Sequence, residues 1–200
     1  MTIARFLLAP VALLFSALPL WADKLSLSEI SAYLDGLTTL EAEFTQINAD
    51  QTISTGTIMI QRPGRARFEY NPPEQTLVIA GGQQLAVFDG KSNTGPEQYP
   101  LKETPLNLIL ERDVNLARSG MVVGHDYDGT ATTVTAQDPD FPEYGTIRLM
   151  FTADPVELRQ WVITDGSGAE TAVILGKLKT GMRFNTATFS IGAEIDKRNR

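Results

Sequence analysis

The segment GTIMIQRPGRARFEY, residues 56–70, decides the fold class of this 200-residue chain. In its second half, residues 65–70, charged side chains alternate with small or apolar ones, which is the period of a half-buried β-strand. The dipeptide Pro63–Gly64 in its middle is typical of a tight turn. The segment therefore predicts two short antiparallel strands, each burying one face.

The same period of two continues outward from this hairpin, for example over residues 40–45. Turn signals divide the rest of the chain into short runs, and they lie at residues 72–73, 81–82, 89–90, 128–129, 138–145, 154–155 and 165–168. The pattern predicts about ten antiparallel strands in one domain, so the fold class is mainly β with helices (α+β).

Two amphipathic helices interrupt this pattern. The first follows Ser26, which has Glu29 three residues later in the arrangement of a capping box, and is expected to end near Gly36. For the second, the sequence predicts Thr104 as N-cap and Pro105 at the first helical position. The apolar residues on one face of the second helix are Leu106, Ile109 and Leu110.

A sheet of about ten strands must curl, split or close. Two short helices can cover only part of an apolar concave face, so one outcome is a partly filled cavity under a helical lid. The other outcome is a packed sandwich without a cavity. The periodicity alone leaves both open.

Composition narrows the class of function. The formal net charge is −7, which disfavours a nucleic-acid-binding surface built on clustered Lys and Arg. The chain contains no cysteine, which excludes disulfides, thiolate metal sites and a lipid anchor on cysteine. We therefore expect neither a cofactor nor a nucleic-acid partner.

Residues 1–22 have the composition of a signal peptide. An apolar run over residues 6–21 is broken by Pro10 and Pro19, and the small residue Ala22 precedes a polar stretch. A membrane anchor is the alternative, but the run is short for a bilayer span. The sequence predicts cleavage after Ala22 and a mature chain, residues 23–200, in an extracytoplasmic space.

Several short motifs resemble a known family in their order and spacing, over nearly the whole region after residue 22. They are Phe44, Thr45 and Gln46; Gly56; Arg62 and Pro63; Arg67, Phe68 and Tyr70; Asp89 and Gly90; Thr104, Pro105 and Leu106; and Trp161, Asp165, Gly168 and Thr171. In this combination the chain resembles the periplasmic outer-membrane lipoprotein carriers of the LolA type.

The resemblance implies an open, strongly curved antiparallel half-barrel capped by an amphipathic helical lid, with a hollow that receives the acyl chains of lipoproteins. It implies that cargo comes from an inner-membrane ATP-driven lipoprotein-releasing complex and goes to the outer membrane, to a receptor there if one is present. It also implies that Arg62 controls the lid by hydrogen bonds that favour the closed, empty form. Strand parity fits, since Ile58, Ile60 and Arg62 share one face. A rim position for Arg62 is the alternative.

Under this hypothesis the candidate lipid-binding residues are the apolar side chains of the first strands and of the lid, namely Phe44, Ile58, Ile60, Phe68, Tyr70, Leu106, Ile109 and Leu110. For each of them, plain core packing is the alternative. Ala66 departs from the family, in which this position is often a large apolar residue, and a small side chain there is expected to reshape the pocket.

Enzymatic readings find little support. The single histidine, His125, would have to serve any His-based metal site or triad, and a turn position is the simpler expectation for it. The motif DYDGT at 126–130 imitates a phosphatase aspartate loop, but the strand–helix alternation of that fold is missing and a turn at Asp128–Gly129 is expected. Asp138, Asp140 and Glu143 lack the spacing of an EF-hand. We therefore expect no catalytic residue and no metal site.

The sequence thus predicts a monomeric, non-enzymatic periplasmic carrier of lipoproteins. Three alternatives stay open: a carrier of another lipid such as a glycolipid, a sensor of lipid or mislocalised protein built on the same half-barrel, and an unrecognised hydrolase.

Overall fold

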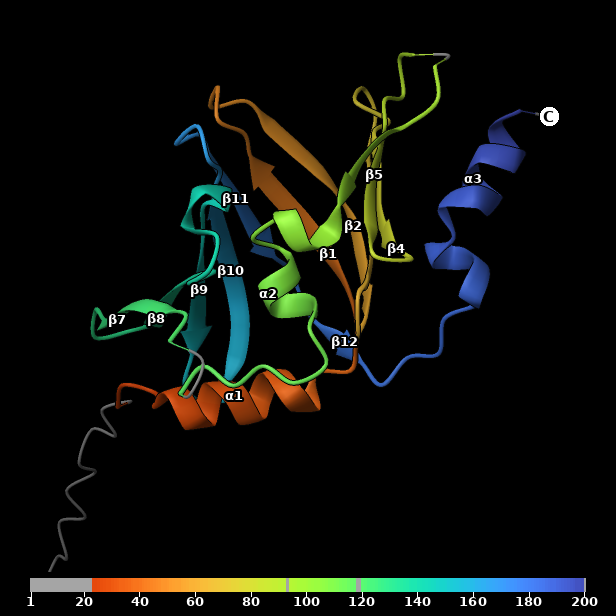
Figure 1. The fold of residues 1–200 in the computed structure, drawn as a ribbon. Coiled ribbons are helices and arrows are strands. Elements are labelled where there is room, and N and C mark those ends of the chain that lie inside the picture. The colour runs from red at the N-terminus through yellow and green to blue at the C-terminus, as the bar shows by residue number, and fades with distance from the viewer. Residues whose placement is uncertain (1–22, 93, 118–119, 200) are drawn as a thin grey trace, which may run out of the picture.

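The computed structural model describes residues 23–92, 94–117 and 120–199, and the expected signal peptide lies outside them. In this part, twelve strands form a single antiparallel sheet (Figure 1). The strands are β1 Thr39–Ile47, β2 Ile53–Gln61, β3 Arg65–Tyr70, β4 Leu77–Gly81, β5 Gln84–Phe88, β6 Glu97–Pro100, β7 Val122–Tyr127, β8 Thr132–Gln137, β9 Thr146–Thr152, β10 Glu157–Thr164, β11 Glu170–Leu175 and β12 Lys179–Thr180. Their order is β6-β5-β4-β3-β2-β1-β11-β10-β9-β8-β7, with β12 paired to β1.

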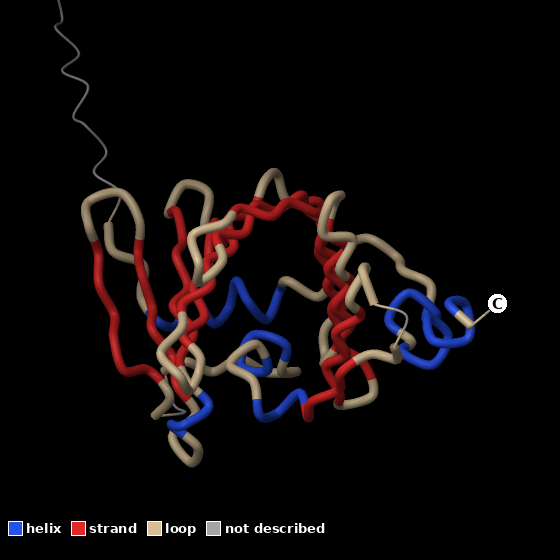
Figure 2. The backbone as a smooth tube through the Cα atoms, turned by 90° about the horizontal axis from the view of Figure 1, so that it is seen from above, coloured by secondary structure: helices blue, strands red, loops and turns tan. Residues whose placement is uncertain are grey.

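The sheet is strongly curved and open on one side. Seen from above, the strands follow an arc that surrounds a short helix (Figure 2). This confirms the predicted open, curved antiparallel sheet, although it has twelve strands where about ten were expected. The two shortest strands, β12 and β6, have two and four residues, too few for an alternating pattern to be recognised.

Residues 56–70 form the predicted hairpin of β2 and β3. In its register Ile58 lies opposite Phe68 and Ile60 opposite Ala66, so the large side chains of β2 and β3 face the concave side together. Gly64 has φ +69 in the turn, a left-handed conformation that glycine adopts at little cost. The hairpin thus supplies the central wall of the hollow.

Helix α1, Leu27–Gly36, begins and ends where the sequence predicts. The Ser26 amide donates to Glu29 Oε2 (2.8 Å) and the Glu29 amide donates to Ser26 Oγ (3.3 Å), which completes the capping box. Ile30 and Leu34 are buried, and the helix lies across one end of the curved sheet (Figure 1).

Helix α2, Asn107–Leu110, is shorter than predicted and begins later. Thr104 does not cap it, because its hydroxyl donates to the carbonyl oxygen of Leu101 (2.8 Å) in the preceding 3₁₀ turn, η1, Leu101–Glu103. The amides of residues 107–109 bond three residues back, so the chain enters α2 through 3₁₀ geometry.

A third helix, α3, Ile191–Arg198, was not predicted; the sequence indicated only two helices. It follows the 3₁₀ turn η3, Thr186–Phe189, and packs on the convex side of the sheet (Figure 2). A separate apolar cluster joins the two layers, consisting of Leu77, Ile79, Ala86 and Phe88 from the sheet and Ile191 and Ile195 from the helix. The remaining element is the 3₁₀ turn η2, Pro142–Tyr144.

His125 was expected to lie in a turn, but it belongs to strand β7. Its Nε2 atom lies 2.8 Å from the carbonyl oxygen of Leu25, so it joins the segment before α1 to the sheet edge. The predicted turn at Asp128 is confirmed, since Asp128 Oδ1 accepts from the amides of Thr130 and Ala131 (both 2.8 Å). Among the helices of the described residues, none has the length and apolarity to cross a bilayer.

Candidate functional site

A cavity of about 580 Å³ lies on the concave side of the sheet, next to the segment that leads into α2. Its volume is in the range of about 300–1,000 Å³ found for small-molecule sites. The lining comes from both halves of the sheet and from the covering segments: Gln46, Phe68, Tyr70, Val78, Leu85, Tyr99, Glu103, Thr104, Pro105, Leu106, Glu143, Tyr144, Trp161, Ile163, Asp165, Gly166, Thr171 and Val173.

An aromatic wall forms the deep side of this cavity. The rings of Phe68 and Trp161 meet edge to face with centroids 6.4 Å apart, and Phe44 supports Phe68 (5.9 Å) and Tyr70 (5.1 Å) from below. Gly56 makes room for this support, because a Cβ atom there would lie 2.8 Å from the Phe44 ring and 2.2 Å from the Glu69 carbonyl oxygen. The wall is therefore apolar and fixed by packing.

A line of polar side chains runs from this wall to the β1–β2 hairpin. The Tyr70 hydroxyl donates to Gln46 Oε1 (2.7 Å), and Gln46 Nε2 donates to Asn48 Oδ1 (2.6 Å). Burial raises the pKa of Tyr70 to about 12, so its hydroxyl keeps its proton. The cavity thus has one polar end and one apolar wall.

Arg62 lies just beyond β2, and its side chain is 5% exposed. Its Nε and Nη2 donate to the carbonyl oxygen of Glu111 (2.8 and 2.6 Å), Nη2 also reaches the Arg112 carbonyl oxygen (3.2 Å), and Nη1 donates to the Leu34 carbonyl oxygen. Burial lowers the pKa of Arg62, partly offset by Asp35, which lies 3.6 Å from Nη2. The guanidinium therefore ties the end of α1 to the segment after α2.

Three further contacts hold the segment after α2 in place. The Val114 amide donates to Asp35 Oδ1 (2.9 Å) and the Leu116 amide to Ser31 Oγ (3.1 Å), both on α1. The Gly64 amide donates to the carbonyl oxygen of Leu110 (2.8 Å) at the end of α2. Residues 101–117 form the cover of the cavity. Together with Arg62, these bonds attach the cover to α1 and to the β2–β3 turn.

The predicted lipid-binding residues fall into two groups. Phe68, Tyr70 and Leu106 line the cavity. The others do not line it and are buried in the main core around it, namely Phe44, Ile58, Ile60, Ile109 and Leu110. Ala66 is fully buried between Ile60 and Ala80 on the neighbouring strands and lies outside the lining.

Several lining residues were not among the residues predicted to bind lipid, including Val78, Leu85, Val173 and Trp161. Trp161 is 1% exposed and also lines the cavity. Cross-strand pairing explains why Val173 lines the cavity. It lies opposite Trp161 in the β10–β11 register, so both side chains are on the same face of the sheet. That register could not be read from one sequence.

Across residues 23–92, 94–117 and 120–199, no three His, Cys, Asp or Glu side chains are placed to hold a metal ion. Asp138 caps its own loop, since Oδ1 accepts from the amides of Asp140 (2.9 Å) and Phe141 (3.3 Å).

Comparison with known proteins agrees with this geometry. The chain matches the family described as outer membrane lipoprotein carrier protein LolA over residues 35–192. An outer-membrane lipoprotein carrier protein of Pseudomonas syringae pv. tomato is 31% identical over 212 aligned residues, which cover 98% of this chain and 99% of that protein. One of Dechloromonas aromatica is 27% identical and covers 90% and 92% of the two chains.

Among solved structures, a domain from Vibrio parahaemolyticus named for outer membrane lipoprotein sorting aligns with a TM-score of 0.50. The alignment covers 88% of this chain and 98% of that one, at 10% identity, and supports the fold alone. Because the family match spans most of the chain and the Pseudomonas relative aligns over almost its full length, the chain belongs to the LolA family of outer-membrane lipoprotein carrier proteins, which are carriers rather than enzymes.

Proposed function

We propose that this protein receives the acyl chains of lipoproteins in the cavity beside α2 and moves them through the periplasm from the inner to the outer membrane. Residues 1–22 would act as a signal peptide that is removed, and residues 23–200 would form the single carrier domain. The partners would be an inner-membrane ATP-driven releasing complex and, if present, an outer-membrane receptor. The protein would act as a monomer.

The cavity is the observation that carries this proposal. Its deep wall is built from Phe68, Trp161 and Val173, and its cover contributes Leu106. Burying a methylene contributes about 0.8 kcal/mol, so shielding one long acyl chain stabilises the complex by on the order of 10 kcal/mol. Such binding needs apolar surface and little specificity, which suits a carrier of many different lipoproteins.

Release is the harder requirement, and the cover supplies a physical route to it. When closure of the cover competes with cargo, the apparent affinity falls by the free energy of closing. The bonds from Arg62, Asp35 and Ser31 to residues 111–116 favour the closed arrangement. In this scheme the bonds are broken when cargo enters and re-formed when it leaves.

Filling the cavity tests the proposal. Val78 lines the cavity from β4, and Val78→Trp should occupy space needed by an acyl chain. We expect at least about tenfold weaker binding of a fluorescent acyl probe, a loss of about 1.4 kcal/mol, and a matching loss of lipoprotein transfer between membranes. Unfolding in urea should show that the variant is still folded.

Val123→Trp is the matched control, since Val123 is 59% exposed on β7 and should tolerate the same change. If Val78→Trp binds the probe and transfers lipoprotein like the original chain, the cavity is not the cargo site.

Mass spectrometry of protein purified from the periplasm separates the alternatives: co-purified glycolipid without lipoprotein would favour the glycolipid carrier. A stable complex with a membrane signalling protein, without transfer, would favour the sensor.

A further inference from the structure

The mouth of the cavity carries negative charge. Glu103, Glu143 and Asp165 are exposed carboxylates that line it, and among the described residues no Lys, Arg or His does. The side chains of Glu103 and Glu143 make no hydrogen bond or ion pair with another described residue, so no residue in 23–92, 94–117 or 120–199 neutralises their charges. The three groups come from separate elements, η1, η2 and the β10–β11 turn, which the fold brings to one opening.

Asp165 is held at the mouth as an anion. Its Oδ1 accepts from the Ser167 hydroxyl (2.6 Å) and from the amides of Ser167 (2.8 Å) and Ala169 (3.0 Å), and these bonds lower the pKa of Asp165. Tyr144 also lines the cavity. Burial is the main cause that raises the pKa of Tyr144, and the negative charges of Glu103, Glu143 and Asp138 raise it further.

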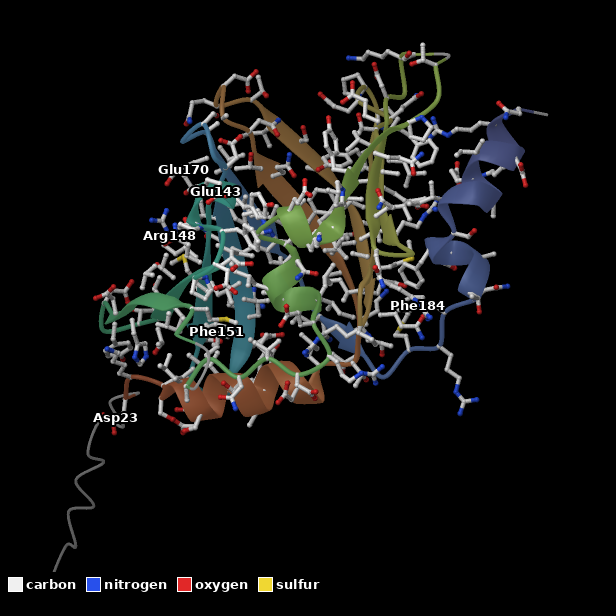
Figure 3. The ribbon with its side chains drawn as sticks, viewed as in Figure 1. Asp23, Glu143, Arg148, Phe151, Glu170 and Phe184 are labelled. Carbon is white, nitrogen blue, oxygen red and sulfur yellow. The ribbon has the colours of Figure 1, made fainter. Side chains whose placement is uncertain are left out.

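The nearby cations Arg148 and Lys102 do not line the cavity. Arg148, labelled with Glu143 and Glu170 in Figure 3, lies between the buried residues Ile147 and Leu149 on β9 and therefore on the opposite face, where it pairs with Glu170 (3.5 Å). Lys102 lines a separate pocket of only about 10 Å³ together with Asp138. The opening of the large cavity therefore stays acidic.

Aromatic rings complete this opening. Tyr99 and Tyr144 both line it, and Tyr144 stacks on Phe141 with centroids 5.2 Å apart. Carboxylates next to aromatic faces attract cations, through charge and through the negative face of the ring. An anionic group at the same place is repelled by all three carboxylates.

We propose that the mouth selects cargo by charge: it favours acyl chains whose attached polypeptide carries Lys or Arg in its first residues, and it disfavours anionic ones. This inference rests on the proposed function, because it assumes that acyl chains enter the cavity. Glu103, Glu143 and Asp165 then determine which cargo is held, and their charges keep free anionic lipids from competing with it.

The test uses two palmitoylated hexapeptides of the same length, one with two Lys and one with two Glu, which displace the uncharged fluorophore N-phenyl-1-naphthylamine from the full mature chain. At low salt the Lys peptide should displace the probe at about one tenth the concentration, a difference of about 1.4 kcal/mol. At about 1 M salt the Debye length is about 3 Å, so the ratio should fall toward one.

The double variant Glu103→Gln/Glu143→Gln should remove most of the preference at low salt. Its matched control is Glu43→Gln/Asp196→Asn, which removes two exposed carboxylates from outside the cavity, on β1 and α3, and should keep the preference. Equal displacement by the two peptides, or a preference unchanged in the mouth variant, would overturn the inference alone. A fluorophore that binds Val78→Trp as well as the original chain would instead overturn the proposed function and the inference with it.

Discussion

Arg62 joins two segments that are distant in the sequence, and it does so mainly through hydrogen bonds to carbonyl oxygens. Its donors reach Glu111 and Arg112 on one side and Leu34 on the other. A hydrogen bond from a charged donor contributes about 1.5–3 kcal/mol, whereas the pair with the half-exposed Asp35 adds little. Most of the stabilisation of the closed cover by Arg62 therefore comes from several hydrogen bonds that the planar guanidinium donates at once, which a lysine does not reproduce.

Replacing Arg62 by Leu should make the protein hold its cargo too well. The closed cover loses its bonds, so we expect about tenfold tighter binding of an acyl probe, slower delivery to acceptor membranes, and an unfolding free energy lower by about 2–4 kcal/mol. Fluorescence titration, a transfer assay and urea unfolding measure the three quantities. Arg65→Leu is the control, because Arg65 is exposed and makes a single long bond, to Gln61 (3.4 Å). Delivery at the normal rate by Arg62→Leu would remove this residue from the release step.

Strand parity alone was enough to place Arg62 on the same face as Ile58 and Ile60, because the period of a strand fixes direction. The carbonyl oxygens that it reaches lie 28 and 49 residues away in the sequence, and a contact at that separation depends on tertiary folding. The same limit applies to the lining: Phe68 and Tyr70 follow from a local pattern, whereas Val173 depends on the β10–β11 register. The sequence therefore indicates on which face of a strand a residue lies more readily than it indicates which residues the side chain contacts.

At the scale of elements, α3 explains a feature of β4 that the sequence displays. The run Leu77–Gly81 is apolar without alternation, which is typical of a strand covered on both faces. Val78 lines the cavity, and Leu77 and Ile79 face the helix on the other side. The helix itself was missed because only Ile191 and Ile195 form its apolar stripe, followed by a charged end that resembles a solvated tail.

Charge pairs reinforce the docking of α3. Arg67 on β3 donates to Glu194 Oε2 (3.3 Å) and to the Thr188 carbonyl oxygen (3.1 Å), while Arg198 donates to Glu194 Oε1 (3.2 Å) and lies 4.8 Å from the ring of Phe88. Burial by itself would raise the pKa of Glu194, but the bond from Arg198 and the charges of Arg67 and Lys197 outweigh burial. The pKa of Glu194 therefore lies below its ordinary value.

This shift gives a pH dependence with a definite sign. A carboxylate whose pKa is lower in the folded state stabilises it above the unfolded pKa of about 4.3, and this stabilisation is lost as the pH falls through the folded value. We expect Glu194→Gln to lower the unfolding free energy by about 1–3 kcal/mol at pH 7, and the gap to close below about pH 4. Urea unfolding at a series of pH values measures it. Asp196→Asn, an exposed change on the same helix, should show no such trend. A gap that stays constant down to pH 3 would mean that Glu194 acts by packing alone.

The whole molecule combines a continuous curved sheet with a cover that has little regular secondary structure of its own. The sheet is continuous from β6 to β7, so each inner strand is paired on both sides. The cover, residues 101–117, contains only one turn of α-helix, and its apolar side chains are buried in the main core. Its bonds to the rest of the molecule reach α1, the β2–β3 turn and, from the Leu101 amide, the carbonyl oxygen of Gln83 (2.9 Å). Segments with few backbone bonds of their own open at low free energy, whereas strands at the centre of a sheet open only near global unfolding. Entry of cargo should therefore move the cover and leave the sheet in place.

Amide hydrogen exchange can detect this division directly. The amides of Gly64, Val114 and Leu116 donate across the boundary between the cover and the rest of the molecule, to Leu110, Asp35 and Ser31 respectively. Adding a saturating acyl ligand should raise the exchange rates of these three amides by about tenfold or more, because occupancy breaks the closed arrangement, while amides at the centre of β1 and β2 keep their protection. In Arg62→Leu the same three amides should exchange faster even without ligand. If the ligand slows exchange at all three sites instead, the cavity is a preformed rigid hollow, and release has to be driven by a partner rather than by closure of the cover.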